Sequence, residues 1–314
     1  MLRQYLPQSR LVRADSFCRT GTEVWLKLES ELPTGSFKPR GAFHALHVNR
    51  GRRPIEEVIA CSTGNHGAAV AYAGRLLGIP ATIFLPENPN PIKRAKIAAL
   101  GARIVEQGKD LSDAFARACD YAQSTEVYFL NDATDPDLTA GPGTITCEIL
   151  EQAPSVDCIV VPMGDTALIR GVAFAAKQQK RQIKIVGVQA ERAPSYYLSW
   201  QAGRAIPTDK CQTIADGLAT RSPAEENVKA IRQLVDDVQL VSEEEMLRAI
   251  RHLLLEEHVV SEPAGAATTA ALLRNFAAYE GQRVVLIVSG ANVSEEVLQA
   301  ALSLGIKSRN TRES

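Results

Sequence analysis

The stretch EVIACSTGNHGAAVAYAGRLLG (residues 57–78) contains, in succession, a strand pattern, a loop pattern and a helix pattern. Residues 57–62 are a short, mostly apolar run, which predicts a buried strand. Small and polar residues follow, and the alanine-rich segment after them ends at Gly78, a natural C-terminal stop for a helix. A buried strand that leads directly into a helix is the repeating unit of α/β proteins with parallel sheets.

The same alternation continues along the chain. Amphipathic segments such as 110–123 and 243–257 predict helices. Several of the apolar runs are almost uninterrupted, as expected when helices cover both faces of a sheet. The predicted strands are 57–62, 81–86, 103–107, 126–130, 158–163, 184–189, 237–242 and 283–290. The expected fold class is therefore α/β, with two open parallel-sheet (α/β/α) lobes.

The length of 314 residues suits about two domains. The predicted strands divide naturally around the segment 131–143, which contains Gly and Pro. We expect a smaller inserted domain at 49–135 and a larger domain made of 1–48 and 136–314, with a cleft between the two lobes. Ligands of open α/β sheets bind where loops leave the carboxyl ends of strands, so the loops after the strands are the candidate sites.

Composition disfavours several classes of partner. Lys+Arg 35 against Asp+Glu 36 gives a formal net charge of -1, and no basic block is present, so we expect no nucleic-acid partner. No apolar stretch approaches the ~20 residues that span a bilayer, so we expect no membrane partner. The six cysteines are scattered without a CxxC pair, which predicts reduced thiols and a cytoplasmic location. The histidines lack HxxxH or HExxH spacing, and no metal site is expected.

Three loops after predicted strands carry small and polar residues. Residues 62–67 offer hydroxyls, a carboxamide and backbone N–H groups at a helix start, which suit an anion such as a carboxylate; the structural alternative is helix capping, which needs one Ser or Thr. Residues 164–167 have the character of a phosphate cradle, although Asp165 would repel a phosphate unless its side chain turned away to cap the helix. Residues 289–292 form the third loop, a weak signal alone.

One lysine stands out in SFKPRGAF (residues 36–43), close behind the strand-like run VWLKLE (residues 24–29). Lys38 lies among Pro and Gly residues at the point where a helix should begin, so the chain turns there. A lysine on a turn is commonly a solvated charge. It can also be a nucleophilic amine, fixed so that it meets a carbonyl group. Lys38 alone does not distinguish the two.

The ordered set of motifs carries a family resemblance. SFKPRGA, STGNHG, GPGT, the glycine-bearing loop after VVP, TIADG, EPAGA and SGAN stand in the order found in pyridoxal-phosphate (PLP) enzymes of the serine/threonine dehydratase branch. That branch shares the fold type of the tryptophan synthase β subunit (fold type II) and includes serine racemase. The resemblance covers about residues 5 to 305 and implies pyridoxal 5'-phosphate as cofactor, bound in the cleft between the two lobes.

The resemblance also implies roles for single residues. Lys38 would join covalently to the cofactor aldehyde and serve as base for the substrate Cα proton, beside the apolar ring of Phe37. Asn65 would hydrogen-bond the phenolic oxygen of the cofactor, and Ser289 would face its pyridine nitrogen. The substrate carboxylate would be held by Ser62, Thr63, Gly64 and His66. The cofactor phosphate would be held by Gly164, Asp165, Thr166, Ala167 and Leu168. The pocket would be lined by Gly217 and Glu262.

The implied reaction is the loss of water from a β-hydroxy amino acid such as threonine or serine, which yields a 2-oxo acid and ammonia. A serine hydroxyl at the pyridine nitrogen makes the cofactor a gentler electron sink, which suits elimination better than transamination. Relatives are commonly homodimers, so we expect a homodimer. The alternatives are an amino-acid racemase or a β-replacement enzyme on the same scaffold, and a non-catalytic PLP-binding protein. A nicotinamide oxidoreductase is disfavoured, because no strand is followed by GxGxxG.

The sequence departs from the family pattern at three places. The phosphate loop reads GDTAL where a run of glycines is usual, which restricts how the backbone approaches a phosphate. Gln189 and Ser195 stand where relatives that bind a divalent cation have carboxylates, which argues against that metal site. Thr63 replaces the serine that the racemase uses as an acid/base, and its stiffer side chain favours elimination over racemisation.

Overall fold

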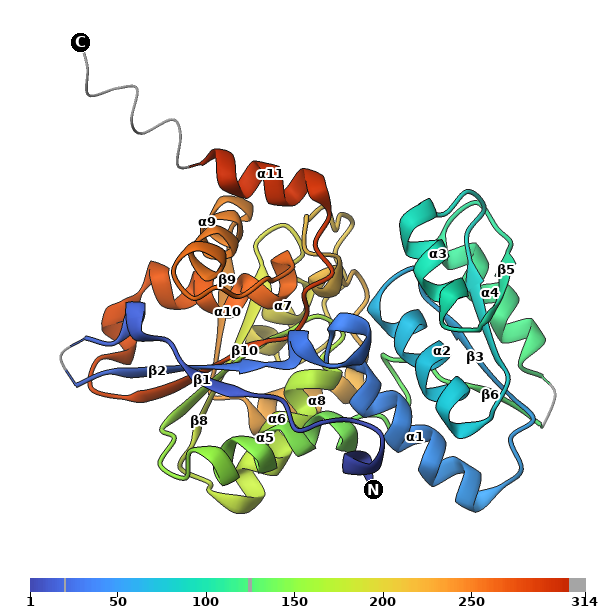
Figure 1. The fold of residues 1–314 in the computed structure, drawn as a ribbon, viewed down its shortest axis with the longest axis horizontal. Helices are drawn as coiled ribbons and strands as arrows, with labels where there is room; N and C mark the ends of the chain where they lie inside the picture. Colours follow the sequence, from blue (N-terminus) through green and yellow to red (C-terminus); the bar gives the residue numbers. More distant parts are fainter. Residues whose placement is uncertain (20, 124–125, 305–314) are drawn as a thin grey trace, which may run out of the picture. The chain divides into compact units, whose positions relative to one another are not determined.

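The computed structural model describes residues 1–19, 21–123 and 126–304. The chain divides into two compact units (Figure 1). The small unit consists of Met1–Pro7 and Leu32–Pro142, and the large unit of Gln8–Glu31 and the chain from Gly143 onward. Compared with the expected boundaries, residues 1–7, 32–48 and 136–142 group with the small unit. The last ten residues of the expected large domain, 305–314, lie outside the described residues.

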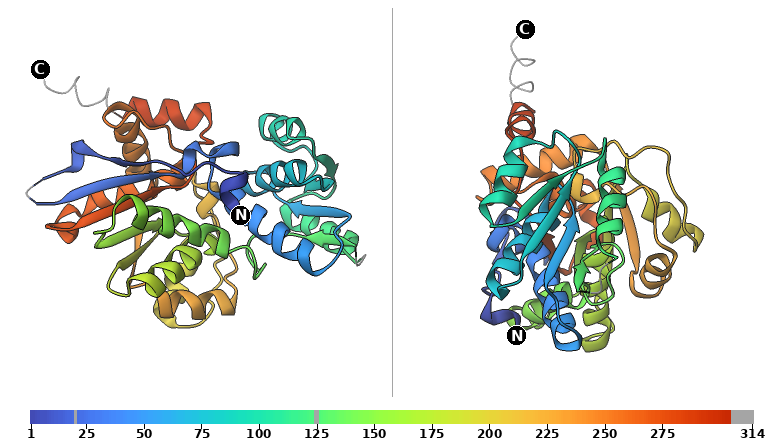
Figure 2. Two further views of the ribbon diagram at one scale, coloured as in Figure 1. Left: turned by 60° about the horizontal axis from the view of Figure 1, so that its bottom comes forward. Right: turned by 90° about the vertical axis from the view of Figure 1, so that its right-hand side faces the viewer.

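The small unit is built on a four-stranded parallel sheet of order β5-β4-β3-β6. Helices α2 and α4 both pack on strands β3 and β4, and α1 packs against α2. Figures 1 and 2 show this sheet with its helices in three orientations. The strands are β3 (Glu57–Cys61), β4 (Ala81–Leu85), β5 (Arg103–Glu106) and β6 (Val127–Phe129). The helices are α1 (Lys38–Arg52), α2 (Asn65–Leu77), α3 (Pro91–Ala99) and α4 (Leu111–Tyr121), with the 3-10 turns η1 (Leu2–Gln4) and η4 (Pro33–Gly35).

The large unit contains a six-stranded sheet of order β1-β2-β10-β7-β8-β9, in which only the edge strand β1 is antiparallel to its neighbour. Its strands are β1 (Leu11–Arg13), β2 (Glu23–Leu28), β7 (Cys158–Pro162), β8 (Lys184–Ala190), β9 (Asp237–Val241) and β10 (Arg283–Val288). Helix α10 lies against β7, β8, β9 and β10. The helices are α6 (Ala167–Gln179), α7 (Ser195–Ala202), α8 (Glu225–Leu234), α9 (Glu243–Leu255), α10 (Pro263–Arg274) and α11 (Glu295–Ser303), and α5 (Ala140–Gln152) contains the boundary between the units. The remaining 3-10 turns are η2 (Asp15–Phe17), η3 (Glu29–Glu31), η5 (Asp216–Leu218) and η6 (Phe276–Tyr279).

Local sequence signals account for where these elements begin and end. Gly78 adopts φ +68°, the left-handed conformation that favours glycine, directly after α2. The side chains of Asn90 and Asp110 accept hydrogen bonds from the first N–H groups of α3 and α4. Ser242 and Glu245 form a reciprocal capping box at the start of α9.

The expected α/β class is confirmed, since parallel sheets are flanked by helices in both units. Each of the eight predicted strands is present within two residues of its expected bounds. Of the two remaining strands, β2 corresponds to the strand-like run 24–29. The three-residue strand β1 was not predicted, because so short an edge strand has no detectable alternation of apolar and polar residues. Within the described residues, no helix combines the length and the apolar character that crossing a membrane requires.

Candidate active site

Lys38 is the first residue of α1, and it is held rather than solvated. The chain turns sharply before it, because Thr34 and Gly35 both have positive φ, at +75° and +72°. The Lys38 side chain is only 13% exposed, and its Nζ lies 2.9 Å from Oδ2 of Asp132. The same nitrogen lies 5.4 Å from the centroid of the Phe37 ring, a cation–π distance. Lys38 is therefore not a freely solvated charge.

Asp132 lies in the loop that follows β6, and this loop is tied to α1. The Tyr128 hydroxyl donates to Asp135 Oδ2 at 2.5 Å. Asn49 of α1 donates to the Tyr128 hydroxyl oxygen at 2.9 Å and to Asp137 Oδ2 at 3.0 Å. Burial raises the pKa of Asp135 above its ordinary value, and the hydrogen bond from Tyr128 opposes that change. The helix that begins with Lys38 therefore also anchors the loop that carries its carboxylate partner.

Sequence reasoning missed Asp132. A signal was available, because Asp132 follows a predicted strand closely and so belongs to the carboxyl edge of a sheet. What the sequence does not contain is the order of the strands. Strand β6 lies beside β3, so the loop with Asp132 leaves the sheet next to the loop 62–66.

The loop 62–66 leaves β3 and leads into α2, which begins at Asn65. Ser62 Oγ accepts a hydrogen bond from the backbone N of Gly64 at 3.3 Å. Gly67 is required on steric grounds, because a Cβ there would lie 2.4 Å from the carbonyl oxygen of Ser62. The loop is thus folded tightly over the first turn of α2, where backbone N–H groups favour an anion.

His66 is buried in this region, at 3% exposure. Its Nε2 lies 2.8 Å from the carbonyl oxygen of Leu130. A carbonyl oxygen only accepts, so Nε2 carries a proton. The other ring nitrogen, Nδ1, is buried with no hydrogen-bond partner among the described residues. Such an atom is usual where a ligand completes the hydrogen bonding.

The small unit therefore brings several predicted site residues to one sheet edge. Phe37 and Lys38 approach it from α1, and Ser62, Thr63, Gly64, Asn65 and His66 follow β3. Asp132 joins them from the adjacent strand end. This arrangement presents an amine, a carboxylate and a helix N-terminus at the carboxyl edge of the sheet.

In the large unit, the loop 164–168 follows β7 and opens α6. Gly164 lies against Gly217 so closely that a Cβ on Gly164 would stand 2.1 Å from the Gly217 carbonyl oxygen. Thr166 adopts φ +73°, a left-handed conformation that costs a non-glycine residue roughly 1–2 kcal/mol. The loop therefore has a backbone conformation typical of glycine at a position occupied by threonine.

Asp165 does turn toward the helix, as expected from the sequence. Its Oδ1 accepts a hydrogen bond from the backbone N of Ala167, the first residue of α6, at 3.0 Å. One turn further, Arg170 donates from Nε to Thr166 Oγ1 at 3.1 Å. Burial lowers the pKa of the Arg170 guanidinium, and attraction to Asp165 acts in the opposite direction. Since a guanidinium keeps its proton in proteins, Arg170 offsets the negative charge that Asp165 brings to this loop.

Arg170 was also missed in the sequence. Its spacing from Thr166 is one helical turn, so the two side chains share a face of α6. That spacing is a usable signal once the start of α6 is known. Without the start of α6, the sequence around Asp165 does not show that Arg170 lies close to the loop.

The other predicted residues of the large unit meet at the carboxyl edge of its sheet. Gly217 lies in η5, and a Cβ there would approach Glu262 Oε1 to 3.8 Å. The backbone N of Glu262 donates to the carbonyl oxygen of Gly290 at 3.0 Å. Glu262 Oε2 accepts from the backbone N of Asn292, also at 3.0 Å. Ser289, next to Gly290, is buried at 4% exposure. The loops after β7 and β10, η5 and the start of α10 thus form one region.

The residues of each unit fit the groups of pyridoxal phosphate. The small unit supplies a part-buried amine, an apolar ring and a buried imidazole nitrogen that has no hydrogen-bond partner in the part of the chain that the structure describes. The large unit supplies the N-terminus of α6. Gly164, just before this helix, packs so closely against the backbone of Gly217 that a side chain at Gly164 would not fit. A helix N-terminus of this kind suits a phosphate group.

Gln189 and Ser195, which stand where cation-binding relatives have carboxylates, form hydrogen bonds within the protein. Gln189 Oε1 accepts from the backbone N of Tyr197 at 2.9 Å, and the Ser195 hydroxyl donates to the Thr220 carbonyl oxygen at 2.6 Å. In the part of the chain that the structure describes, no group of three or more His, Cys, Asp or Glu side chains is arranged to bind a metal ion.

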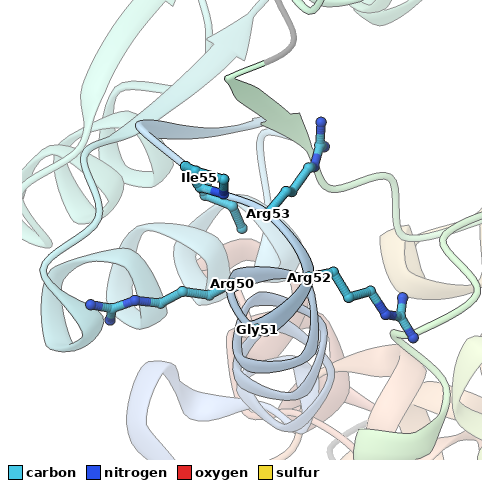
Figure 3. Close-up of a pocket in the computed structure, with 6 residues that line it drawn as sticks. Arg50, Gly51, Arg52, Arg53 and Ile55 are labelled. Atoms are coloured by element: carbon cyan, nitrogen blue, oxygen red, sulfur yellow. The ribbon is translucent and has the colours of Figure 1, made fainter.

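A separate pocket of about 520 Å³ lies at the C-terminal end of α1 (Figure 3). Lys38 is at the other end of this 15-residue helix, roughly 20 Å away. The three arginine side chains drawn there point in different directions and do not converge on a common point. Arg50 donates to the carbonyl oxygen of Leu77, and Arg52 pairs with Asp137. These two side chains therefore stabilise the fold of the small unit through contacts within the protein. The lining residues are Arg50, Gly51, Arg52, Arg53, Pro54 and Ile55.

Comparison with known proteins gives the family of this chain. The family model "Pyridoxal-phosphate dependent enzyme" matches residues 2–290. L-threonine ammonia-lyase of Thermotoga maritima is 37% identical over 288 residues, which cover 91% of this chain and 71% of that protein. The processed form of threonine deaminase isoform 2 from Solanum lycopersicum is similar in structure, with a TM-score of 0.91 and 30% identity over 96% of this chain and 89% of that one. Maize serine racemase gives a TM-score of 0.89 and 29% identity over 98% and 95%.

The resemblance that the ordered motifs indicated is therefore confirmed, and with it the use of pyridoxal 5'-phosphate. The match extends over nearly the whole chain and includes both units. This chain belongs to the family of pyridoxal-phosphate-dependent enzymes.

Proposed function

We propose that the protein is a PLP-dependent ammonia-lyase that removes water from a β-hydroxy amino acid and releases a 2-oxo acid and ammonia. Threonine is the first candidate substrate and serine the second. The relatives named L-threonine ammonia-lyase and L-threonine dehydratase support this choice of substrate. The observation that carries the proposal is the part-buried Lys38 amine, fixed at the carboxyl edge of the small sheet.

The chemistry divides between the cofactor and the protein. When bound, pyridoxal phosphate draws electrons from the substrate Cα and so stabilises negative charge there. Lys38 holds the cofactor and takes the Cα proton, which requires an amine within hydrogen-bond reach of that proton. The backbone N–H groups of residues 62–66 bind the substrate carboxylate at the start of α2, with Asn65 directed to the cofactor.

Residues of the large unit hold the phosphate and the ring. The start of α6, with the loop 164–168, receives the phosphate, and Arg170 offsets the charge of Asp165 there. Gly217 and Glu262 line the pocket. Ser289 offers a neutral hydroxyl to the pyridine nitrogen, which favours elimination over transamination.

A racemase is the second candidate function, because maize serine racemase is among the similar structures. Elimination is preferred since Thr63 stands at the position of the acid/base serine that the racemase resemblance implies. A threonine hydroxyl has fewer accessible side-chain rotamers with which to deliver a proton to the far side of Cα.

The assembly and location are further parts of the proposal. We infer a homodimer, to be measured by light scattering of the purified protein. All six cysteines are free thiols, which supports a reducing compartment such as the cytoplasm.

The proposed function is tested with a panel of 3-hydroxy amino acids. Purified protein loaded with PLP is expected to form ammonia and 2-oxo acid from threonine or serine, and the Lys38→Ala variant is expected to form neither. D-amino acid is measured in the same mixtures. Ammonia without D-amino acid supports elimination, D-amino acid without ammonia supports the racemase, and neither product from any member contradicts both.

A further inference from the structure

We propose that Asp132 is the counter-ion that holds the Lys38 ammonium while this lysine is not bonded to the cofactor, and that it thereby sets the pH at which the protein takes up pyridoxal phosphate. Asp132 is a positioning residue in this role. The inference rests on the proposed function, because it needs Lys38 to be the residue that binds the cofactor.

The ion pair is direct and partly shielded from water. Nζ of Lys38 and Oδ2 of Asp132 are 2.9 Å apart, and their side chains are 13% and 31% exposed. A carboxylate at this distance favours the charged form of an amine, and the effect is stronger where water is partly excluded. The pair therefore opposes loss of the ammonium proton.

Both members of the pair are fixed by the same helix. Lys38 begins α1, and further along that helix the His44 ring hydrogen-bonds the Asp137 carbonyl oxygen at 2.6 Å, while Arg52 pairs with the Asp137 carboxylate. On the other side of Asp132, the carbonyl oxygen of Leu130 accepts from His66 at 2.8 Å. The loop is thus held before and after Asp132, and the carboxylate cannot readily leave the amine.

The other ionisable groups around the pair have their own roles. Burial, and to a smaller extent the negative charge of Asp132, raise the pKa of the Cys61 thiol to about 12. This thiol of β3 is therefore neutral near pH 7. The carboxylate of Asp135 accepts the hydroxyl of Tyr128. His66 of α2 uses Nε2 on a carbonyl oxygen, and Arg40 is buried one turn further along α1. Asp132 is the carboxylate seen in hydrogen-bond contact with Nζ.

The covalent step needs a neutral amine. The Lys38 ammonium first releases one proton to solvent. Nζ then forms a C=N bond with the aldehyde carbon of pyridoxal phosphate, and the aldehyde oxygen leaves as water with the two remaining N–H hydrogens. Because Asp132 favours the ammonium, it makes the first of these steps unfavourable at low pH. Removal of its charge should move cofactor uptake to lower pH.

The test measures cofactor uptake by the apo-protein rather than turnover. Apo-protein is mixed with pyridoxal phosphate over a series of pH values, and the rate of the absorbance change is recorded. For Asp132→Asn we expect the pH profile to move about one unit lower, which is roughly tenfold faster uptake on the acid side of the midpoint. Asp120→Asn, which removes an exposed carboxylate from the end of α4, is the matched control and should superimpose on the wild type.

The outcomes separate this inference from the proposed function. Asp132→Glu, which keeps the charge, should stay near the wild-type profile, and Asp132→Ala replaces the Asn variant if that one fails to fold. Profiles that coincide, or uptake slowed equally at every pH, would overturn the role of Asp132. A borohydride-reducible covalent adduct that still forms in Lys38→Ala would instead contradict the proposed function itself.

Discussion

Two lysine–carboxylate pairs, one in each unit, have nearly the same geometry and very different surroundings. In the large unit, Lys27 Nζ lies 2.8 Å from Glu148 Oε2, with side chains 0% and 6% exposed. In the small unit, Lys38 Nζ lies 2.9 Å from Asp132 Oδ2, with side chains 13% and 31% exposed. Distance alone does not distinguish a structural lysine from a reactive one.

The surroundings do distinguish them. Lys27 lies within strand β2, donates a second hydrogen bond to the Ser9 carbonyl oxygen at 2.8 Å, and is completely enclosed. Glu148 also accepts from the backbone N of Ser9 at 3.2 Å. Lys38 stands instead at a helix start beside the carboxyl ends of strands, where ligands bind. The comparison supports a structural role for Lys27 and is consistent with the catalytic role proposed for Lys38.

The largest expected effect is on activity in the Lys38→Ala variant. Loss of the amine should reduce kcat by at least about 10³-fold, which is about 4 kcal/mol of transition-state stabilisation. The free energy of unfolding should change by no more than about 1 kcal/mol, because the pair is part-exposed. Steady-state kinetics and urea unfolding measure the two quantities, and Lys109→Ala, an exposed lysine of the same unit, is the control. If Lys38→Ala lost several kcal/mol of unfolding free energy but kept the wild-type kcat, Lys38 would be the structural lysine and not the reactive one.

The converse is expected for Lys27→Met. Breaking a buried pair leaves Glu148 as an uncompensated buried charge. The free energy of unfolding should therefore decrease by about 3 kcal/mol. The kcat of the folded protein should be unchanged. Adding Glu148→Leu should recover part of the lost stability, since both charges are then gone. Stability equal to that of the wild type in the single variant would show that this pair is not structural.

A third effect concerns the charge in the phosphate loop of the large unit. Arg170→Gln leaves Asp165 unopposed at the start of α6, so the dissociation constant of pyridoxal phosphate should rise about tenfold, or about 1.4 kcal/mol. Asp165→Asn should lower that constant. Arg181→Gln, at an exposed site of the same unit, is the control for general charge loss. Equilibrium dialysis gives the values, and equal constants in all four proteins would refute the compensation.

The smallest effect is expected from metal removal. Gln189 and Ser195 are already hydrogen-bonded within the protein, so incubation with a chelator should leave both activity and unfolding temperature unchanged. Restoration of lost activity by Mg²⁺ or Ca²⁺ after chelation would mean that a metal site exists.

Much of the fold was predictable because it depends on local patterns. The eight strands and the loops after them follow from apolar runs and small-residue corners such as 62–67. The contacts between residues far apart in the sequence were not predictable in this way. Lys38 and Asp132 are 94 residues apart, and Lys27 and Glu148 are 121 apart. Their approach depends on strand order and helix packing, which no spacing rule contains.

The same limit explains Thr166 and Arg170. A threonine in a glycine-like backbone conformation is visible only in φ, and the charge of Asp165 is explained only when the next turn of α6 is in place. The sequence predicted the loop and the turn of Asp165 toward the helix, but it did not predict Arg170, because that residue lies outside the motif.

Borohydride reduction of the PLP-loaded protein, followed by peptide mass mapping, shows which lysine is joined to the cofactor. Reduction fixes the cofactor to the lysine that holds it, and we predict its mass on the peptide that contains Lys38. Label on a peptide with another lysine, or no label on a protein that retains bound cofactor, would contradict the account.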